Sequence, residues 1–170
     1  MDLRLHKGFY LRDVLEVAPD LLGKILVRDF GNGDLQKFII TDVEAYRGVE
    51  DLACHASKGR TARTRIMFDE GGIIYVYFIY GMYWMLNVVT GARNDASAVL
   101  IRGFKGISGP GRVGRVLRLD RSFYGENLTM SDRIRIEEGI TTPAYHSTTR
   151  IGIGYAGEPW VSKPWHFIMK

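Results

Sequence analysis

Residues 73–89 read IIYVYFIYGMYWMLNVV, the most distinctive stretch of the chain. Its length approaches that of a membrane-spanning helix. However, four tyrosines, Gly81 and Asn87 interrupt it, and its aromatic and β-branched residues favour strands. Gly81-Met82 fits a two-residue type II′ turn, in which glycine comes first. We therefore expect a buried β-hairpin, with a transmembrane helix as the alternative.

The sequence on either side of this hairpin predicts short helices and strands. Before it, residues 12–22 form a helix with Asp13 as its N-cap, and a turn at residues 31–34 joins two strands. After it, a glycine-rich connector at residues 106–111 leads to a helix at residues 112–119. The expected strands cover residues 24–27, 37–46, 98–104, 133–137 and 150–155, before a terminal PWHFIM segment.

The chain has the size and composition of one α+β domain over residues 1–170. It is 46% hydrophobic and 25% charged, close to the averages of globular proteins, and it contains no repeat and no linker. The single cysteine, Cys54, excludes an internal disulfide framework and indicates a reducing compartment. Residues 1–16 contain early acidic residues and no apolar core, which argues against a secretory signal.

Positive charge is concentrated in the middle of the chain. Between Lys58 and Arg121, eleven basic and four acidic residues give a balance of +7, which leaves −3 for the rest of a chain of net charge +4. Residues 47–72 show little periodicity and predict a polar surface loop. This loop holds three closely spaced arginines: Arg60, Arg63 and Arg65. We expect a polyanionic partner, most simply nucleic acid, with a plain solvated surface as the alternative.

Glu44 is a candidate for a chemical role. Strict alternation along its strand places four side chains on one face: Ile40, Asp42, Glu44 and Tyr46. A solvated face is the plain alternative. Tyr46 beside Glu44 favours partial desolvation, which makes a carboxylate a better general base.

A metal site is not predicted. Glu50, Asp51 and His55 follow Glu44 closely, and their side chains are of types that bind metals. The chain has only four histidines, however, and they form no HExxH pattern, while a paired CxxC is impossible with one cysteine.

The tyrosines of the expected hairpin suggest contacts with bases. Tyr75 and Tyr77 share one strand face, and Tyr80 and Tyr83 flank the turn. Cross-strand packing of aromatic rings is the plain alternative. A tyrosine at a hairpin tip is harder to bury than one in mid-strand, and beside a basic loop it can stack on a base or wedge between base pairs.

Residues 109–114 match the pattern GxGxxG after a strand. A dinucleotide-binding fold would also show repeated βαβ units, which the sequence lacks. The backbone at Gly111, together with Arg112 and Arg115, instead suits a DNA phosphate at the start of a helix. A simple connector remains the alternative.

The same residues resemble a known family. Matching segments follow one another in order and with matching gaps: TDVEAY (41–46), ED (50–51), ACH (53–55), GRT (59–61), Arg63, MF (67–68), YVY (75–77), YGM (80–82) and LNVV (86–89). Further matches are AVLIR (98–102), GPG (109–111), RIGI (150–153) and PW (164–165). The chain thus resembles, over nearly its whole length, the alkyladenine (3-methyladenine) DNA glycosylases of the mammalian type, which also occurs in bacteria.

The resemblance implies roles for the candidate residues. Glu44 matches the general base that activates water, and Arg102 and the backbone carbonyl of Ile151 match groups that hold this water. The walls of the base pocket match Tyr46, His55 and Tyr77. Tyr80 matches the wedge that fills the gap left by the flipped base, and Asn87 matches the residue that discriminates against the exocyclic amine of guanine.

The implied activity is that of a monofunctional enzyme without metal or organic cofactor. It excises alkylated purines such as 3-methyladenine and 7-methylguanine, and often hypoxanthine and ethenoadenine, from double-stranded DNA. The implied fold is a single domain with a curved, mainly antiparallel sheet and surrounding helices. Only six residues separate Arg102 from Gly109, fewer than in larger relatives. This difference affects DNA contacts outside the pocket more than the chemistry.

Two other functions remain open from the sequence. A non-catalytic module for damaged or single-stranded DNA would use the same tyrosines and arginines, with Glu44 only structural. An enzyme with a nucleotide cofactor would use the glycine motif. We expect a monomer that does not bind membranes, in the cytoplasm with the nucleoid if the source is prokaryotic and in the nucleus if it is eukaryotic.

Overall fold

A computed structural model describes residues 1–170. Nine strands form one sheet in which every pairing is antiparallel, with the order β3-β4-β5-β2-β1-β7. The strands are β1 Ile25–Asp29, β2 Leu35–Tyr46, β3 Ile74–Ile79, β4 Tyr83–Thr90, β5 Ser97–Phe104, β6 Ile107–Ser108, β7 Ile134–Glu137, β8 Tyr145–Thr148 and β9 His166–Met169. The prediction of an α+β domain with a mainly antiparallel sheet is confirmed, and no parallel βαβ unit supports a dinucleotide-binding fold.

The central hairpin is present, but its turn differs from the prediction. β3 pairs with β4 from Ile74 opposite Val88 to Ile79 opposite Tyr83. The turn is centred on Tyr80 and Gly81, with φ of 55° and 65°, which is the pattern of a type I′ turn. The expected type II′ turn at Gly81-Met82 is therefore wrong, and Tyr80 lies in the turn itself rather than beside it. None of the helices has the length and apolar character needed to cross a membrane.

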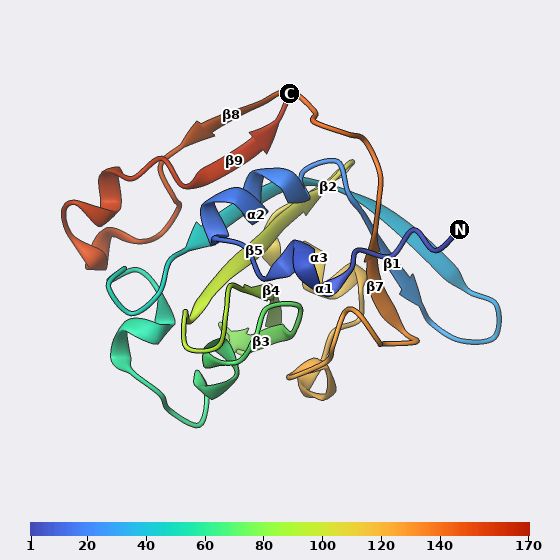
Figure 1. Cartoon of the computed structure of the whole chain (residues 1–170), viewed down its shortest axis with the longest axis horizontal. Coiled ribbons are helices and arrows are strands. Elements are labelled where there is room, and N and C mark those ends of the chain that lie inside the picture. The colour runs from blue at the N-terminus through green and yellow to red at the C-terminus, as the bar shows by residue number, and fades with distance from the viewer.

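The long strand β2 connects the two halves of the sheet. Its first half pairs with β1, and its second half lies between β5 and β9 (Figure 1). The register shifts between Ile40 and Val43, and both side chains lie in the main hydrophobic core. Strict alternation predicted that Ile40 and Glu44 share one face of the strand. They do not, because the irregularity in β2 interrupts the alternation.

Short helices pack on this sheet. They are α1 Lys7–Tyr10, α2 Val14–Leu21 and α3 Pro110–Val116. Asp13 is the N-cap of α2, as predicted, and its side chain accepts a hydrogen bond from the Leu15 amide at 2.8 Å. α3 ends three residues earlier than expected and packs on β4, where a Cβ at Gly114 would lie only 1.9 Å from the Trp84 carbonyl oxygen.

Two other segments differ from the sequence predictions. Residues 47–72 contain two 3₁₀ helices, η1 His55–Lys58 and η2 Arg65–Phe68. This segment is only partly a surface loop, because Cys54 and Met67 are buried in a second hydrophobic cluster with Tyr75. The strand expected at residues 150–155 is absent; η4, Gly154–Ala156, lies there instead.

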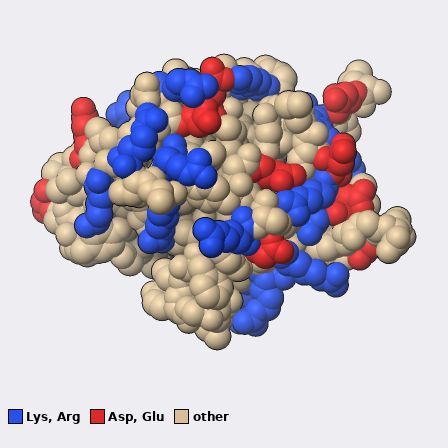
Figure 2. All heavy atoms as spheres, turned by 90° about the horizontal axis from the view of Figure 1, so that it is seen from below, with Lys and Arg blue, Asp and Glu red and all other residues tan.

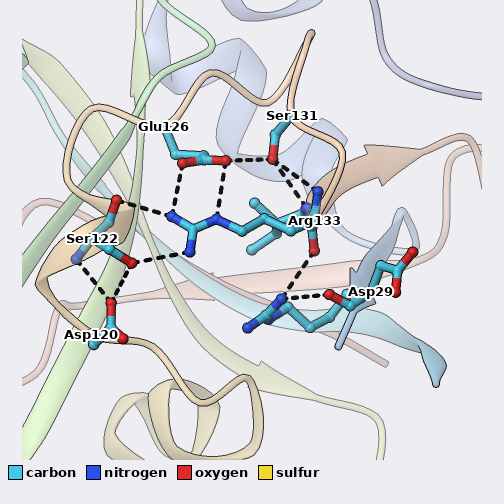
Figure 3. Close-up of polar contacts among 8 residues, drawn as sticks. Asp29, Asp120, Ser122, Glu126, Ser131 and Arg133 are labelled. Atoms are coloured by element: carbon cyan, nitrogen blue, oxygen red, sulfur yellow. Dashed lines mark hydrogen bonds and ion pairs between the residues drawn. The ribbon is translucent and has the colours of Figure 1, made fainter. Parts of the chain in front are cut away.

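A polar network away from the expected site residues fixes the loops around β7. The Arg133 guanidinium donates to Glu126 and to Ser122, and it lies 3.7 Å from the centre of the Phe123 ring (Figure 3). This network ties η3, Arg121–Phe123, to the segment that precedes β7. It stabilises the fold and contains none of the candidate site residues.

Candidate active site

A cavity of about 450 Å³ opens beside β2, β3, β4 and β5. Nine of the candidate residues predicted from the sequence line it: Glu44, Tyr46, His55, Arg63, Tyr77, Tyr80, Asn87, Arg102 and Ile151. These residues come from six separate segments of the chain. The volume falls within the range of about 300–1,000 Å³ that is typical of small-molecule sites.

Glu44 lies at this cavity with its carboxylate held by three donors. Its side chain is fully buried. Oε1 accepts a hydrogen bond from the Tyr46 hydroxyl at 2.9 Å and lies 3.5 Å from Nη1 of Arg102. Oε2 accepts a hydrogen bond of 2.7 Å from the backbone amide of Ile151. The structure thus brings Ile151 to Glu44 through its N–H, whereas the resemblance assigned a role to its carbonyl group.

Aromatic rings form the walls of the cavity. The rings of His55 and Tyr77 meet edge to face, with their centroids 4.6 Å apart, and Nδ1 of His55 lies 2.9 Å from the Tyr75 hydroxyl. Burial, with a smaller contribution from the positive charge of Arg63, lowers the pKa of His55 to about 4. Burial raises the pKa of Tyr77 to about 12. Both rings are therefore uncharged at neutral pH.

The three candidate arginines of the 47–72 segment, Arg60, Arg63 and Arg65, have different positions. Arg63 lines the cavity, and its guanidinium lies 4.9 Å from the centre of the Tyr77 ring. Arg60 instead donates to Asn94 at 2.8 Å, and Arg65 packs over Tyr124. Only Arg63 can therefore contact a ligand in the cavity, while the other two lie outside it.

Asn87 and Tyr80 occupy opposite environments at the cavity. Asn87 is buried on β4, and its Nδ2 donates to the backbone carbonyl of Tyr75 at 3.2 Å. Tyr80 is 82% exposed at the hairpin tip, so its ring projects into solvent beside the opening. This exposure leaves the ring free to contact a macromolecule.

The glycine motif lies next to this hairpin. A Cβ at Gly111 would come within 2.8 Å of the Tyr83 ring, so glycine allows α3 to approach β4 closely. Arg112 is exposed, and the guanidinium of Arg115 lies 5.2 Å from the centre of the Tyr83 ring. These three residues are outside the cavity, on the side of the hairpin tip.

Basic side chains gather on one part of the surface that is seen from below the view of Figure 1 (Figure 2). Several Lys and Arg side chains lie close together on the left half of the molecule, with a few acidic side chains around them, whereas acidic and basic side chains alternate on the right half. A negatively charged partner would therefore be attracted to the left half of this face.

Two side-chain pairs at the site were missed by sequence reasoning. Arg150 donates to both carboxylate oxygens of Asp51, at 2.6 and 3.0 Å, and packs over the Tyr46 ring. His166 lies 2.6 Å from Asp42. Because Asp51 is occupied by Arg150, the arrangement does not favour a metal site with Glu50 and His55. Asp51 and Arg150 lie within matched motifs, but nothing in the sequence pattern pairs them, and no signal pointed to His166.

Sequence comparisons with known proteins identify the family of the chain. The profile of the methylpurine-DNA glycosylase family matches residues 8–108 and 105–170. A protein of Wolbachia pipientis wMel is 44% identical over 170 residues, which cover 96% of this chain and 89% of its own. Proteins of Methanocella arvoryzae and Legionella pneumophila (strain Corby) are 40% and 41% identical, cover 98% of this chain, and are themselves covered to 92% and 94%. All three have the provisional name 3-methyladenine DNA glycosylase.

The cavity has aromatic walls and a buried carboxylate, and the chain is similar in sequence to these proteins. The protein is therefore a DNA glycosylase, which is a hydrolase of N-glycosidic bonds. The chain belongs to the methylpurine-DNA glycosylase family. Its relatives named here are bacterial and archaeal, so the narrower expectation of the mammalian type is not supported.

Proposed function

We propose that this protein is a monofunctional glycosylase of base excision repair that removes alkylated purines from double-stranded DNA. The damaged nucleotide swings out of the duplex, and a water molecule activated by Glu44 hydrolyses its N-glycosidic bond. The observation that supports this most strongly is the position of Glu44 at a cavity with walls of Tyr46, His55 and Tyr77. The substrates include 3-methyladenine and 7-methylguanine, as the names of the relatives suggest for the first.

The carboxylate of Glu44 performs two tasks in this reaction. It takes a proton from the water that attacks C1′, and its negative charge stabilises the positive charge that develops on the sugar. Tyr46 and the Ile151 amide hold the carboxylate in one orientation, so it does not need to reorganise during the reaction. A positioned base of this kind typically accelerates a reaction by about 10²–10⁴-fold.

The aromatic walls favour a flat and positively charged base. Alkylation at N3 or N7 makes a purine cationic, which improves it as a leaving group and attracts it to electron-rich rings. Since the His55 ring is neutral at physiological pH, it does not repel such a base. Stacking contributes about 1–3 kcal/mol per base, which is comparable to the few kcal/mol that extrusion of the nucleotide costs.

Neutral lesions place a further demand on the enzyme. Hypoxanthine and ethenoadenine, which the proposal includes, must gain a proton before they leave. Asn87 is a buried residue that lines the cavity, where its side chain can test the exocyclic group of a purine. We assign to it the rejection of guanine, since an amide that already donates to the Tyr75 carbonyl has limited freedom to adapt.

Tyr80 and the basic side chains complete the contacts with DNA. Tyr80 enters the duplex and occupies the space of the extruded base, while Arg63 and the basic residues outside the cavity bind phosphates. These outer residues are Arg60, Arg65, Arg112 and Arg115, with the backbone at Gly111. The protein acts as a monomer, and in a prokaryotic cell it works in the cytoplasm at the nucleoid.

An excision assay tests the proposal directly. Wild-type protein is incubated with methylated duplex DNA, and free bases are separated by chromatography. Release of free 3-methyladenine by the wild type, and its loss in Glu44→Gln, is the expected result. A protein that binds the methylated duplex without releasing any base would instead be a non-catalytic module for damaged DNA.

A further inference from the structure

His166 lies directly behind Glu44 and is not explained by the contacts described so far. On β9 it is the Cα partner of Glu44 on β2. Its Nε2 lies 2.6 Å from Oδ1 of Asp42, and its Nδ1 lies 3.9 Å from Oε2 of Glu44. The ring is 3% exposed, and Nδ1 has no hydrogen-bond partner. A buried polar atom without a partner calls for an explanation.

The contact with Asp42 fixes the proton on one ring nitrogen. An ionised carboxylate only accepts hydrogen bonds, so the short contact requires a hydrogen on Nε2 of His166. In the neutral ring, Nδ1 then has a free lone pair, and the carboxylate oxygen Oε2 of Glu44 lies 3.9 Å from it. Two acceptors face each other there, and a proton between them would convert this contact into a hydrogen bond.

The groups that face His166 carry one more negative charge than positive charge. The acidic groups that face it are Asp42 and Glu44 on β2. The facing base is Arg102 on β5, whose guanidinium lies 3.5 Å from Glu44 and 4.0 Å from Asp42. β8 contributes only the uncharged Thr148 as a partner. Glu44 is fully buried and Asp42 is 22% exposed. These two carboxylates with one guanidinium lack one positive charge, which a single proton shared by Glu44 and His166 would supply.

We infer that His166, oriented by Asp42, is a positioning residue that takes over the proton Glu44 removes from the attacking water. This inference rests on the proposed function. As the water oxygen bonds to C1′, the N-glycosidic bond breaks and its electron pair leaves with the base. The water proton passes to Glu44 and from Oε2 to Nδ1 of His166, and Asp42 balances the charge of the imidazolium.

The arrangement has a physical purpose. Glu44 accepts hydrogen bonds from Tyr46 and the Ile151 amide, so donors already face both oxygens of its carboxylate. Handing the proton to His166 leaves Glu44 anionic beside the positive sugar. In the Ser-His-Asp triad, a carboxylate likewise orients a histidine and stabilises its charged form.

The test combines a conservative substitution with a matched control. His166→Gln keeps a donor for Asp42 but has no nitrogen that accepts a proton, and His146→Gln makes the same change at an exposed residue of β8. We measure the affinity for a methylated duplex and the single-turnover rate of base release from pH 5 to 9. H166Q should release base about 10–100-fold more slowly, with lesion affinity and melting temperature close to those of the wild type. H146Q should match the wild type.

The pH profile separates proton transfer from packing. In the wild type, the proton that inhibits the reaction can bind to Glu44 or to His166. As the pH is lowered, the rate therefore begins to fall at a higher pH than it does when only Glu44 can bind this proton. The acid limb of the H166Q profile should therefore move to lower pH, by roughly one unit. An unchanged acid limb, or a loss of affinity as large as the loss of rate, would overturn the inference.

A double variant distinguishes failure of this inference from failure of the proposed function. If His166 acts through Glu44, then E44Q/H166Q should release base as slowly as E44Q alone. An additional loss in the double variant would show that His166 acts independently and would overturn the inference. Should E44Q itself release base at the wild-type rate, the role of Glu44 fails and this inference with it, whereas a wild type that releases no base would refute the proposed function. Asp42→Asn, which keeps an acceptor but removes the charge, provides a second variant and should slow release as H166Q does.

Discussion

The backbone amide of Ile151 donates a hydrogen bond of 2.7 Å to the carboxylate of Glu44 across 107 residues of sequence. Just before Ile151, Arg150 is bound to the buried carboxylate of Asp51. The ion pair between Arg150 and Asp51 therefore fixes the position of the Ile151 amide. Glu44 is thus held by a hydrogen bond from the C-terminal part of the chain. Tyr46, which donates to Glu44, lies under the same arginine.

Glu44→Gln should separate binding from chemistry. Glutamine keeps the size of the side chain and an acceptor oxygen, but it cannot take a proton from water. The single-turnover rate of 7-methylguanine release should fall by about 10²–10⁴-fold, while affinity for the lesion stays within a few-fold. Near-normal excision by this variant, measured by quench-flow or manual sampling, would remove Glu44 from its assigned role.

Tyr80→Ala should affect capture of the lesion more than general DNA binding. The ring is 82% exposed and makes no packing contribution to the core, so the melting temperature should not change. Loss of one stacking contact of about 1–3 kcal/mol should weaken binding to a lesion-containing duplex by roughly 5- to 150-fold. Met82→Ala, at an exposed neighbour in the same turn, is the matched control. Equal losses for damaged and undamaged duplexes would reject the wedge.

Local patterns predicted much of the fold. Alternating aromatic and β-branched residues indicated β3 and β4, and the Asp13 cap indicated the start of α2, because both signals depend on neighbours in the sequence. The turn at Tyr80 was misplaced, since glycine can adopt positive φ at either central position and tyrosine at positive φ is uncommon. The hydrogen bond of 3.2 Å from the Met82 amide to the Ile79 carbonyl fixes its location.

The site was predictable only where a family pattern was present. The family motifs, from TDVEAY around Glu44 to RIGI around Ile151, contain the nine candidate residues that line one cavity. No local signal could show that His166 faces Glu44, because the contact depends on β9 pairing with β2 near the end of the chain. The irregularity of β2 between Ile40 and Val43 was equally hidden, since it arises from the register against β5. Long-range pairing, rather than local propensity, determines both features.

Asp51→Asn should destabilise the protein markedly. Asp51 and Arg150 have no exposed side-chain surface, so the variant leaves a buried guanidinium without its counter-charge. Such a loss typically costs about 3–5 kcal/mol in the free energy of unfolding, which urea titration would measure. Asp20→Asn removes the exposed pair with Arg12 and should cost less than about 1 kcal/mol. Similar costs for both variants would show that the Asp51–Arg150 pair does not secure the site.

His55 should make stability depend on pH in the acidic range. Its pKa is lowered by burial to about 4, below the ordinary value of 6.5, so between these values the unfolded chain binds the proton and the folded chain does not. Stability therefore falls as the pH drops from 6.5 to 4, by an amount on the order of 2–3 kcal/mol. His55→Gln should show a smaller loss when urea titrations at pH 7 and pH 4.5 are compared, whereas His6→Gln, at an exposed residue, should behave as the wild type. A loss as large in H55Q as in the wild type would assign the effect to other groups.

DNA affinity should fall steeply with salt, because arginines outside the cavity replace counterions on the phosphates. Arg112 is exposed and forms no ion pair, so Arg112→Gln changes only this contact. The variant should bind damaged and undamaged duplexes more weakly by the same factor, and the slope of log K against log salt should decrease by about 1.

Lys170→Gln is the control for this prediction. The C-terminus lies at the end of the molecule away from the β3 strand, so this variant should leave the slope unchanged (Figure 1). Fluorescence anisotropy between 50 and 200 mM salt, the range in which phosphate contacts have large effects, would measure both slopes. A flat salt dependence in the wild type would contradict docking through phosphates, and an unchanged slope in R112Q would remove Arg112 from the interface.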